Sequence, residues 1–281
     1  MGGPWEEGWR GYARLVFQRE GRRTVLRGRD CRVPLQVLRT HYPEGADLAH
    51  VALIHTAGGM VGGDVLEVEV TVSPGAKALV TTQSAGKVYR SAGPQSVQRQ
   101  TLRVGENAWL EWMPRETILF NGANFRQVTR VELRGGGRLL LGEMAVLGRT
   151  ARGEAFQKGL WRQETEVWRG EEPLWVDRLR LEGGDGLLES AAGFSGAVAV
   201  GTLVLLGTEI PQGILDAVGR AGERCGREVR WGYSRLPEGL WFRALAPSGR
   251  AVQEAIHAVW SVLRSSQLGR PPCYPRLWAT G

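Results

Sequence analysis

The residues of this chain with the clearest chemical potential lie in a glycine-rich stretch, HTAGGMVGGD, that begins at His55 and ends at Asp64. Gly58 and Gly63 have the spacing of a phosphate-binding loop, in which backbone amides surround the phosphates and a following lysine reaches the outer oxygens. Asp64 stands in place of that lysine, and its carboxylate would repel a phosphate. The segment therefore does not predict a nucleoside triphosphate site.

A dinucleotide-binding loop is excluded by the strand pattern after the glycines. Such a loop leads into a helix whose N-terminus holds the pyrophosphate, whereas the segment LEVEVTV after Asp64 alternates apolar and polar residues as a strand does. We therefore expect the glycines to form tight turns or bulges. Asp64 either accepts hydrogen bonds from the amides of its turn or lines a polar interior, and the sequence leaves both roles open.

No set of residues predicts a self-sufficient catalytic centre. The histidines are not spaced as HExxH or at i, i+4, and no GxSxG motif is present; they are His41, His50, His55 and His257. Glu111, Glu116 and Glu143 lie in or beside apolar strands, where an unpaired carboxylate is costly. Nearby arginines such as Arg115 and Arg149 are their expected partners, and a polar interior lining is the alternative.

A polar cluster lies in the segment VTTQSAGKVYRS, which holds Lys87, Tyr89 and Arg90. Because no phosphate loop lies beside these residues, we expect them to contact a partner protein; internal salt bridges of Lys87 and Arg90 are the alternative. Trp278, in the proline-rich tail, is a further candidate anchor for an interface, since tryptophan is enriched at interface hot spots.

The strands that would position these residues recur with a period of about 30 residues, which is typical of stacked supersecondary units. Each unit is an alternating strand, a glycine turn and a more apolar strand. The units are LEVEVTV-SPGA-KALVTTQ, SVQRQTLRV-GEN-AWLEWM, RQVTRVELR-GGG-RLLLGEM and, more loosely, WRQETEVWR-GEE-PLWVDRLRL. One hairpin cannot bury its apolar face alone, so the repeat predicts a mainly β, layered scaffold of stacked hairpins that resembles a β-solenoid.

Two helices are predicted in the last third of the chain. The first begins at Pro211 and ends before Gly226, and the second follows Ser248 as N-cap and ends at Gly269. No linker or shift of composition interrupts the chain, so we expect a single β-rich domain over residues 1–281.

Composition narrows the functional classes. The chain has 281 residues, of which 42% are hydrophobic, and no apolar run long enough for a transmembrane helix. Its three cysteines form no CxxC pair, and the N-terminus does not resemble a signal peptide, so we expect a reduced, cytoplasmic protein with no membrane partner. The net charge of +7 favours an acidic partner.

Several motifs together strongly resemble the urease accessory proteins of the UreD (UreH) family. They are GGMVGGD, GAKALVTTQSAGKVYRS, LEWMPRETILF, VLGRTARGEAF, WVDRLRL, LPEGLWFRAL and YPRLW, in family order from Arg10 to Trp278. Thr56 and Ala57 stand where the family usually has two prolines, and Gln83 and Ser84 stand where Pro-Gly is common. These departures concern local turns.

The resemblance implies a non-catalytic β-rich scaffold that holds no tightly bound cofactor. Proteins of this kind dock on apo-urease and recruit a UreF-type accessory protein and, through it, a UreG-type GTPase. The assembly delivers Ni²⁺ to urease, and a polar internal path through the D-type subunit is thought to carry the ion in transit. The resemblance therefore implies protein partners and a transient metal cargo.

Residue roles can be assigned along that implied path. Nickel is served by imidazole, carboxylate, carbonyl and water ligands, and a transfer path needs weak successive sites. Asp64 is the first candidate to line it, followed by Glu143 and His55 and then by Glu111.

Two other classes compete with this hypothesis. A β-helical carbohydrate-active enzyme would suit stacked strands, but the chain offers no convincing acid and base pair. A basic nucleic-acid-binding module would suit the charge, but no aromatic-basic motif or recognition helix is present, so we expect no nucleic-acid partner.

Overall fold

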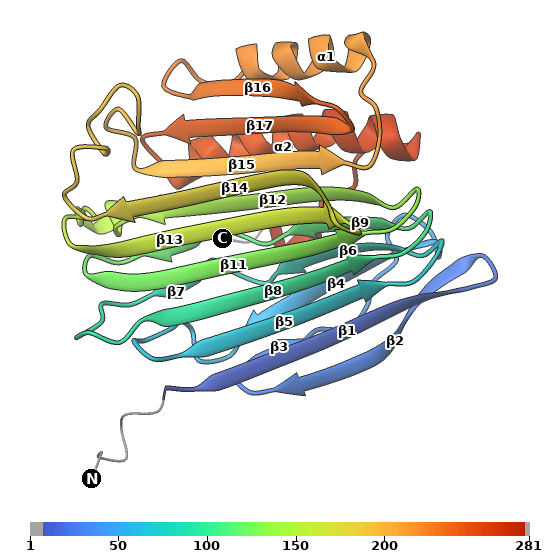
Figure 1. The fold of residues 1–281 in the computed structure, drawn as a ribbon, viewed down its shortest axis with the longest axis horizontal. Coiled ribbons are helices and arrows are strands. Elements are labelled where there is room, and N and C mark those ends of the chain that lie inside the picture. The colour runs from blue at the N-terminus through green and yellow to red at the C-terminus, as the bar shows by residue number, and fades with distance from the viewer. Residues whose placement is uncertain (1–7, 279–281) are drawn as a thin grey trace.

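The computed structural model describes residues 8–278 as two β-sheets packed face to face, with helices on the outer side of one sheet (Figure 1). Residues 1–7, on which part of the signal-peptide argument rests, and residues 279–281 at the end of the predicted domain lie outside the described residues. Neither helix of the described chain is long and apolar enough to cross a membrane.

The first sheet has seven strands in the order β14-β13-β11-β8-β5-β1-β2. They are β1 (Arg10–Glu20), β2 (Arg23–Arg32), β5 (Val65–Val72), β8 (Ser96–Val104), β11 (Ala123–Leu133), β13 (Gly159–Arg169) and β14 (Glu172–Glu182). On β5 Leu66, Val68, Val70 and Val72 are buried and Glu67 is exposed, as the alternation predicted.

The second sheet has ten strands and runs β16-β17-β15-β12-β9-β6-β4-β3, with β10 paired to both β12 and β7. They are β3 (Leu35–Val37), β4 (Leu48–His55), β6 (Lys77–Thr82), β7 (Gly86–Val88), β9 (Trp109–Met113), β10 (Thr117–Leu119), β12 (Arg138–Leu147), β15 (Ala199–Leu206), β16 (Arg230–Leu236) and β17 (Gly239–Ala246).

The predicted repeat and the β-solenoid-like fold class are confirmed, but the pairing inside the first three units differs from a hairpin. β5 lies in the first sheet and pairs in parallel with β8, while β6 lies in the second sheet and pairs in parallel with β9. Each of these three units thus crosses from one sheet to the other, through turns in which Gly75, Asn107 and Gly136 respectively adopt positive φ. Only the fourth unit, β13 and β14, is an antiparallel hairpin. The apolar faces of a unit oppose one another across the core, and a hairpin within one sheet could not achieve this.

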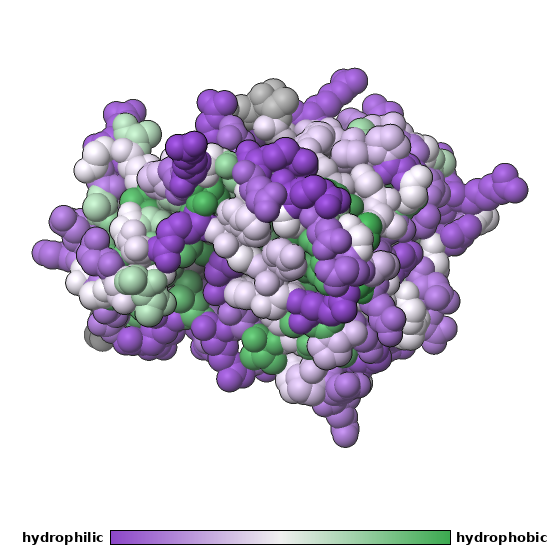
Figure 2. Space-filling view, turned by 90° about the horizontal axis from the view of Figure 1, so that it is seen from above, coloured by the Kyte–Doolittle hydropathy of each residue, from purple (hydrophilic) through white to green (hydrophobic). Residues whose placement is uncertain are grey.

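The central strands of the second sheet, β9, β12 and β15, are covered on both faces, which explains why they are nearly continuous apolar runs. The inner face of this sheet packs on the first sheet around residues such as Phe17, Leu102 and Phe125. Its outer face packs on α2 (Gly249–Leu268), with Trp109 and Trp260 in that second core, and α1 (Gln212–Glu223) packs on α2. Seen from the α1 side, hydrophilic side chains dominate the surface and smaller hydrophobic areas lie between them (Figure 2).

Both predicted helices are confirmed. Ser248 caps α2 by accepting a hydrogen bond from the amide of Ala251 at 3.2 Å, and Gly269 ends the helix in the left-handed conformation at φ 64°. Pro211 precedes the first residue of α1. The tail then runs to a short 3-10 turn, Arg276–Trp278.

Candidate functional site

Polar side chains occupy part of the inner face of the first sheet, where the surrounding positions are apolar. These residues form what we call the polar row: Gln98 and Gln100 of β8, Gln127 and Thr129 of β11, and Gln163 and Thr165 of β13. The three strands are parallel and in register, so Gln127 is paired with both Gln98 and Gln163. Because side chains two residues apart share a face of a strand, the row forms two adjacent ladders across the sheet.

Glu143 of β12 points at the polar row from the opposite sheet. Its Oε1 accepts hydrogen bonds from Gln127 Nε2 at 2.7 Å and from Thr129 Oγ1 at 2.8 Å. Its Oε2 accepts from Gln163 Nε2 at 2.5 Å and from Thr165 Oγ1 at 3.1 Å. Burial raises the pKa of Glu143, and these bonds act in the opposite direction. All four donors are neutral, so the predicted pairing of Glu143 with arginine is wrong and the alternative, a polar lining, is confirmed.

Three small cavities lie along the polar row, and the first of them is lined in part by the exposed Lys87. Their volumes are about 80, 20 and 10 Å³, and adjacent cavities share walls. Gln98 and Thr117 line both the first and the second, and Glu143 and Gln163 line both the second and the third. A space of about 10–15 Å³ on this measure accommodates one water molecule, so the chain of cavities fits single waters or a small cation.

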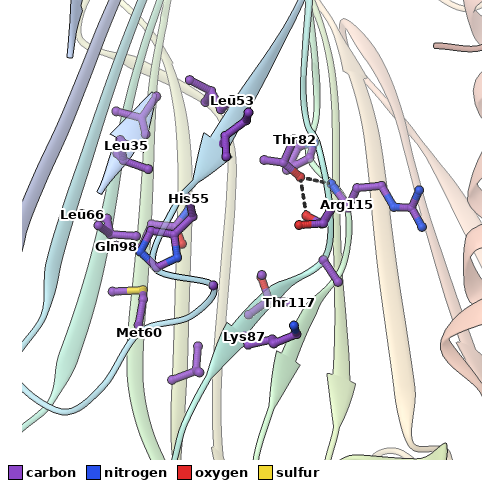
Figure 3. Close-up of a pocket in the computed structure, with 18 of the residues that line it drawn as sticks. Leu35, Leu53, His55, Met60, Leu66, Thr82, Lys87, Gln98, Arg115 and Thr117 are labelled. Carbon is purple, nitrogen blue, oxygen red and sulfur yellow. Dashed lines mark hydrogen bonds between the residues drawn. The ribbon is translucent and has the colours of Figure 1, made fainter. Parts of the chain in front are cut away.

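His55 stands at the wall of the first cavity (Figure 3). Burial lowers the pKa of His55, against the opposing effect of the Asp64 charge, so the ring is neutral at pH 7. Its Nε2 is buried and has no hydrogen-bond partner within residues 8–278. A neutral imidazole nitrogen without a partner is a potential metal ligand.

Asp64 is buried beside this wall without lining any of the three cavities. Its Oδ1 accepts a hydrogen bond from the amide of Trp9 and its Oδ2 one from the amide of Val61, both at 2.8 Å. The interpretation of Asp64 as a cap of its own turn is confirmed. Its predicted contact with nickel stays a prediction.

Glu111 lies on the other face of the second sheet, away from the polar row. It is fully buried and accepts hydrogen bonds from the indoles of Trp109 at 3.0 Å and Trp260 at 2.9 Å. Arg264 of α2 donates to both carboxylate oxygens at 3.1 Å. Burial raises the pKa of Glu111 although Arg264 opposes it. The expected arginine partner is therefore present, but it comes from α2 and not from Arg115 or Arg149.

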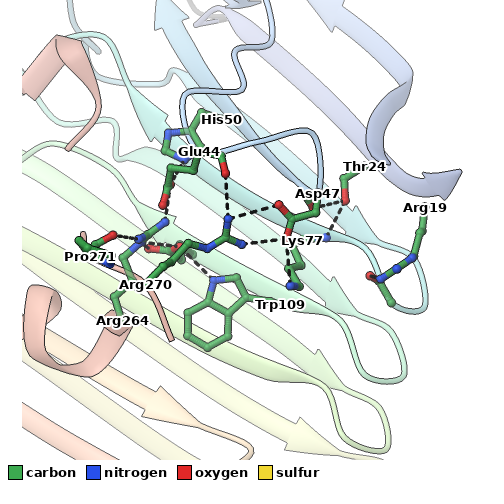
Figure 4. Close-up of polar contacts among 12 residues, drawn as sticks. Arg19, Thr24, Glu44, Asp47, His50, Lys77, Trp109, Arg264, Arg270 and Pro271 are labelled. Carbon is green, nitrogen blue, oxygen red and sulfur yellow. Dashed lines mark hydrogen bonds and ion pairs between the residues drawn. The ribbon is translucent and has the colours of Figure 1, made fainter. Parts of the chain in front are cut away.

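Arg264 also belongs to a charged network that links the C-terminal tail to the loop before β4 (Figure 4). Arg264 also donates to Glu44, which accepts from His50 Nε2 at 2.7 Å. Asp47 is bound by Arg270 at 2.8 Å and by Lys77 at 3.1 Å. Through these contacts the network connects α2 to the second sheet.

The four residues predicted to contact a partner protein lie in different surroundings. Lys87 is exposed and lines the first cavity (Figure 3), and Tyr89 packs edge-on against Phe120 with ring centroids 4.9 Å apart. Arg90 is exposed at a separate pocket. Trp278 is half-buried against its own chain.

Trp278 is held by two contacts within the protein. Its ring stacks on His257 with centroids 4.2 Å apart, and its Nε1 donates to Thr81 Oγ1 at 2.9 Å. Burial lowers the pKa of His257 to about 4, so the stacked imidazole is neutral. The tail is less exposed than the sequence suggested, and contacts of these four residues with a partner stay predictions.

A repeated pattern of polar residues in the sequence corresponds to the polar row. The first strand of three successive units carries Gln-x-Gln, Gln-x-Thr and Gln-x-Thr at residues 98–100, 127–129 and 163–165. These positions share the alternation of the buried residues Leu102, Val131 and Val167. Polar residues repeated in that phase predict a polar stripe inside the sandwich.

Comparisons with a protein-family profile and with individual proteins point to the same family. The profile of the family described as UreD urease accessory protein matches residues 10–279. A protein of Nostoc sp. (strain PCC 7120) called urease accessory protein UreD is 42% identical over 274 residues, which cover 98% of this chain and 97% of the relative. Proteins of the same name from Alkalilimnicola ehrlichii (41% identical; 99% and 94% covered) and Thermosynechococcus vestitus (39%; 96% and 98%) are similar throughout. The chain therefore belongs to the UreD urease accessory protein family.

Proposed function

We propose that this chain is a non-catalytic urease maturation factor that passes Ni²⁺ along its polar row. In this proposal the chain docks on apo-urease and recruits a UreF-type accessory protein and, through it, a UreG-type GTPase. The ion is a cargo in transit and not a resident cofactor. Membership of the UreD family supports the role in urease maturation.

The observation that carries the proposal is the environment of Glu143. The carboxyl group of Glu143 is buried, accepts hydrogen bonds from four neutral donors and has no ion-pair partner among the described residues. An arriving cation supplies that compensation and favours the ionised form, because a nearby positive charge lowers the pKa of a carboxyl. Glutamine amides also present an oxygen when they rotate, so Gln127 and Gln163 can contribute oxygen ligands on either side of Glu143.

The ends of the row fit the same function. At the first cavity the neutral ring of His55 offers a nitrogen ligand. At the third cavity Asp177 is paired with Arg243, whose Nε donates to Thr202 at 3.1 Å. Among the described residues no three His, Cys, Asp or Glu side chains are grouped to hold a metal ion, which suits the weak sites of a transfer path. Glu111 is outside this path because it faces α2, and Asp64 supports the path through its turn.

Substitution of Glu143 by glutamine tests the proposal, because it removes the charge while keeping the shape of the side chain. We expect the nickel content and ureolysis of apo-urease reconstituted with Glu143→Gln to fall several-fold. Glu164→Gln is the matched control, because Glu164 is the residue next to Gln163 and forms a surface ion pair with Arg126 at 3.0 Å. Equal nickel loading with both variants, or maturation of apo-urease without the chain, would refute the proposal.

A further inference from the structure

A second concave site lies at the edge of the sandwich, apart from the polar row. Its volume is about 480 Å³, and its walls come from the residues after β7, after β10 and before β13. We call it the Arg90 pocket. Three cationic side chains line it, from Arg90, Arg149 and Lys158, together with the carboxylate of Glu154.

Only one of the three cations is neutralised in place. Arg149 forms an ion pair with Glu154 and lies over the ring of Phe120, 4.7 Å from its centroid. Arg90 and Lys158 are exposed and have no ion-pair partner within residues 8–278. Three cations and one carboxylate thus leave two positive charges facing the same space.

The walls of the pocket are fixed by hydrogen bonds. Asn121 Oδ1 accepts from the amides of Gln157 at 3.0 Å and Lys158 at 2.8 Å, and the amide of Asn121 donates to Glu154 at 3.0 Å. The amide of Gly122 donates to the carbonyl of Lys158 at 2.7 Å. The amide of Ser91, next to Arg90, also donates to the carbonyl of Gly122 at 3.0 Å, so the three wall segments are held in one arrangement before any ligand arrives.

Gly122 determines where Arg90 lies. It has φ +84°, and a Cβ at this position would approach Cγ of Arg90 to 2.6 Å. The bare turn lets the aliphatic part of Arg90 lie against it, which restricts the stem of that side chain. A side chain with a restricted stem loses less entropy when it binds a ligand.

We propose that the Arg90 pocket binds an acidic segment of a protein partner, with carboxylates on Arg90 and Lys158. The inference rests on the proposed function to the extent that the partner belongs to the urease assembly. The pocket falls in the range of about 300–1,000 Å³ that accommodates larger ligands, which exceeds what one small anion fills. Its wall includes Phe120, whose ring lies beneath the guanidinium group of Arg149.

The surrounding surface favours an acidic peptide over a nucleic acid. A nucleic acid is bound by a continuous track of unpaired cations. On the outer face of the first sheet, by contrast, arginines are paired with glutamates across the strands, as in Arg99 with Glu67 and Arg126 with Glu164. These two arginines of the outer face are compensated by carboxylates, whereas Arg90 and Lys158 have no ion-pair partner among the described residues.

The test measures binding of a fluorescent peptide of alternating glutamate and glycine to the full chain by anisotropy. The variant is Arg90→Gln with Lys158→Gln. The control is Arg130→Gln with Arg152→Gln, which removes the same charge from two exposed residues that do not line the pocket. We expect about tenfold weaker binding for the pocket variant, at the scale of two exposed charge pairs, and less than twofold for the control.

Four results would overturn the inference. Equal weakening by both double variants would indicate diffuse charge, and no weakening by either would indicate another site. Displacement of the peptide by millimolar phosphate, or tighter pocket-dependent binding of a single-stranded oligonucleotide, would indicate a different ligand.

Gly122→Ala provides a second variant in which every charge is kept. It should weaken peptide binding about as much as Arg90→Gln alone, because it displaces the stem of Arg90. Unchanged peptide binding in a folded Gly122→Ala protein would contradict the assigned position of Arg90. Glu143→Gln should leave peptide binding unchanged, so failure of the nickel proposal and failure of this one are distinguishable.

Discussion

Replacing Arg264 by methionine tests whether the buried charges on the α2 side hold the fold together. Arg264 has no exposed surface and donates to both oxygens of Glu111 at 3.1 Å and to Glu44. Methionine fills much of the same volume but leaves two buried carboxylates without their cation. Breaking a buried pair from one side costs about 3–5 kcal/mol, so we expect the free energy of unfolding to fall by about 4 kcal/mol.

Denaturant unfolding measures this loss, and thermal unfolding should show a decrease in Tm of about 8 °C for a chain of this size. Arg250→Met is the matched control, because Arg250 lies on the same helix in an exposed pair with Glu254. An exposed pair contributes at most about 1 kcal/mol. Adding Glu111→Gln to Arg264→Met should recover about 2 kcal/mol, because one of the two uncompensated charges is removed.

The pH dependence of the free energy of unfolding is the more stringent test. The pKa of Glu111 is already raised by burial, and loss of Arg264 removes the main opposing charge, so it rises further. A carboxyl with a raised pKa binds its proton more tightly in the folded state than in the unfolded state, so stability increases as the pH falls. The cost of Arg264→Met should therefore be larger at pH 8 than at pH 5. An equal cost for Arg264→Met and Arg250→Met, or a cost that grows as the pH falls, would show that the ion pair does not compensate the buried charge.

Two further substitutions separate structural from functional roles. Asp64→Ala removes the acceptor of two backbone amides and should lower the free energy of unfolding by about 2 kcal/mol; the folded variant should load urease with less nickel, and normal loading would leave Asp64 only its role as a cap. Trp278→Ala removes the stack on His257 and the bond to Thr81, and should cost about 3 kcal/mol in the isolated chain; weaker complex formation at unchanged stability would instead make Trp278 a partner contact.

Features of this fold that depend only on residues close together in the sequence could be predicted from the sequence. The alternation of β5 and the Ser248 and Gly269 caps of α2 are local, and all were predicted. Strand pairing is not local. Nothing in LEVEVTV and KALVTTQ decides whether the two strands pair with each other or with their equivalents in the next unit, since both arrangements bury the same side chains. The parallel pairing emerges only when the two sheets face each other.

The two buried glutamates show where site prediction failed. Glu111 and Glu143 occupy similar apolar strands, but β9 and β12 pair with Glu111 opposite Leu140, which faces the helices. Glu143 is three residues beyond Leu140 and so faces the opposite side, toward the polar row. Both faces of these strands are covered, so their apolar patterns do not reveal which side is which. The register between the strands had to be known.

The polar row gives the fold no more stability than apolar side chains of similar shape would, so a purely structural scaffold would not need it. Replacing both members of a buried hydrogen bond by apolar groups of similar shape is close to neutral or stabilising. We therefore expect a combined variant, Glu143→Met with Gln127→Leu, Gln163→Leu and Thr165→Val, to be as stable as the unmodified chain or more so. Thr129 keeps a hydrogen bond within the row, to Gln100 at 3.1 Å.

The same variant should no longer support nickel loading of apo-urease, because the carboxylate and most of the oxygen ligands are gone. Stability is measured by denaturant unfolding, and nickel by metal analysis of the reconstituted urease. Retained stability with lost nickel transfer would show that the row is kept for transport, as expected when a local rule of core packing is broken at a functional site. A collapse in stability would show instead that the hydrogen bonds around Glu143 are needed for the fold, and the reasoning that assigns the row to the ion would then lose its basis.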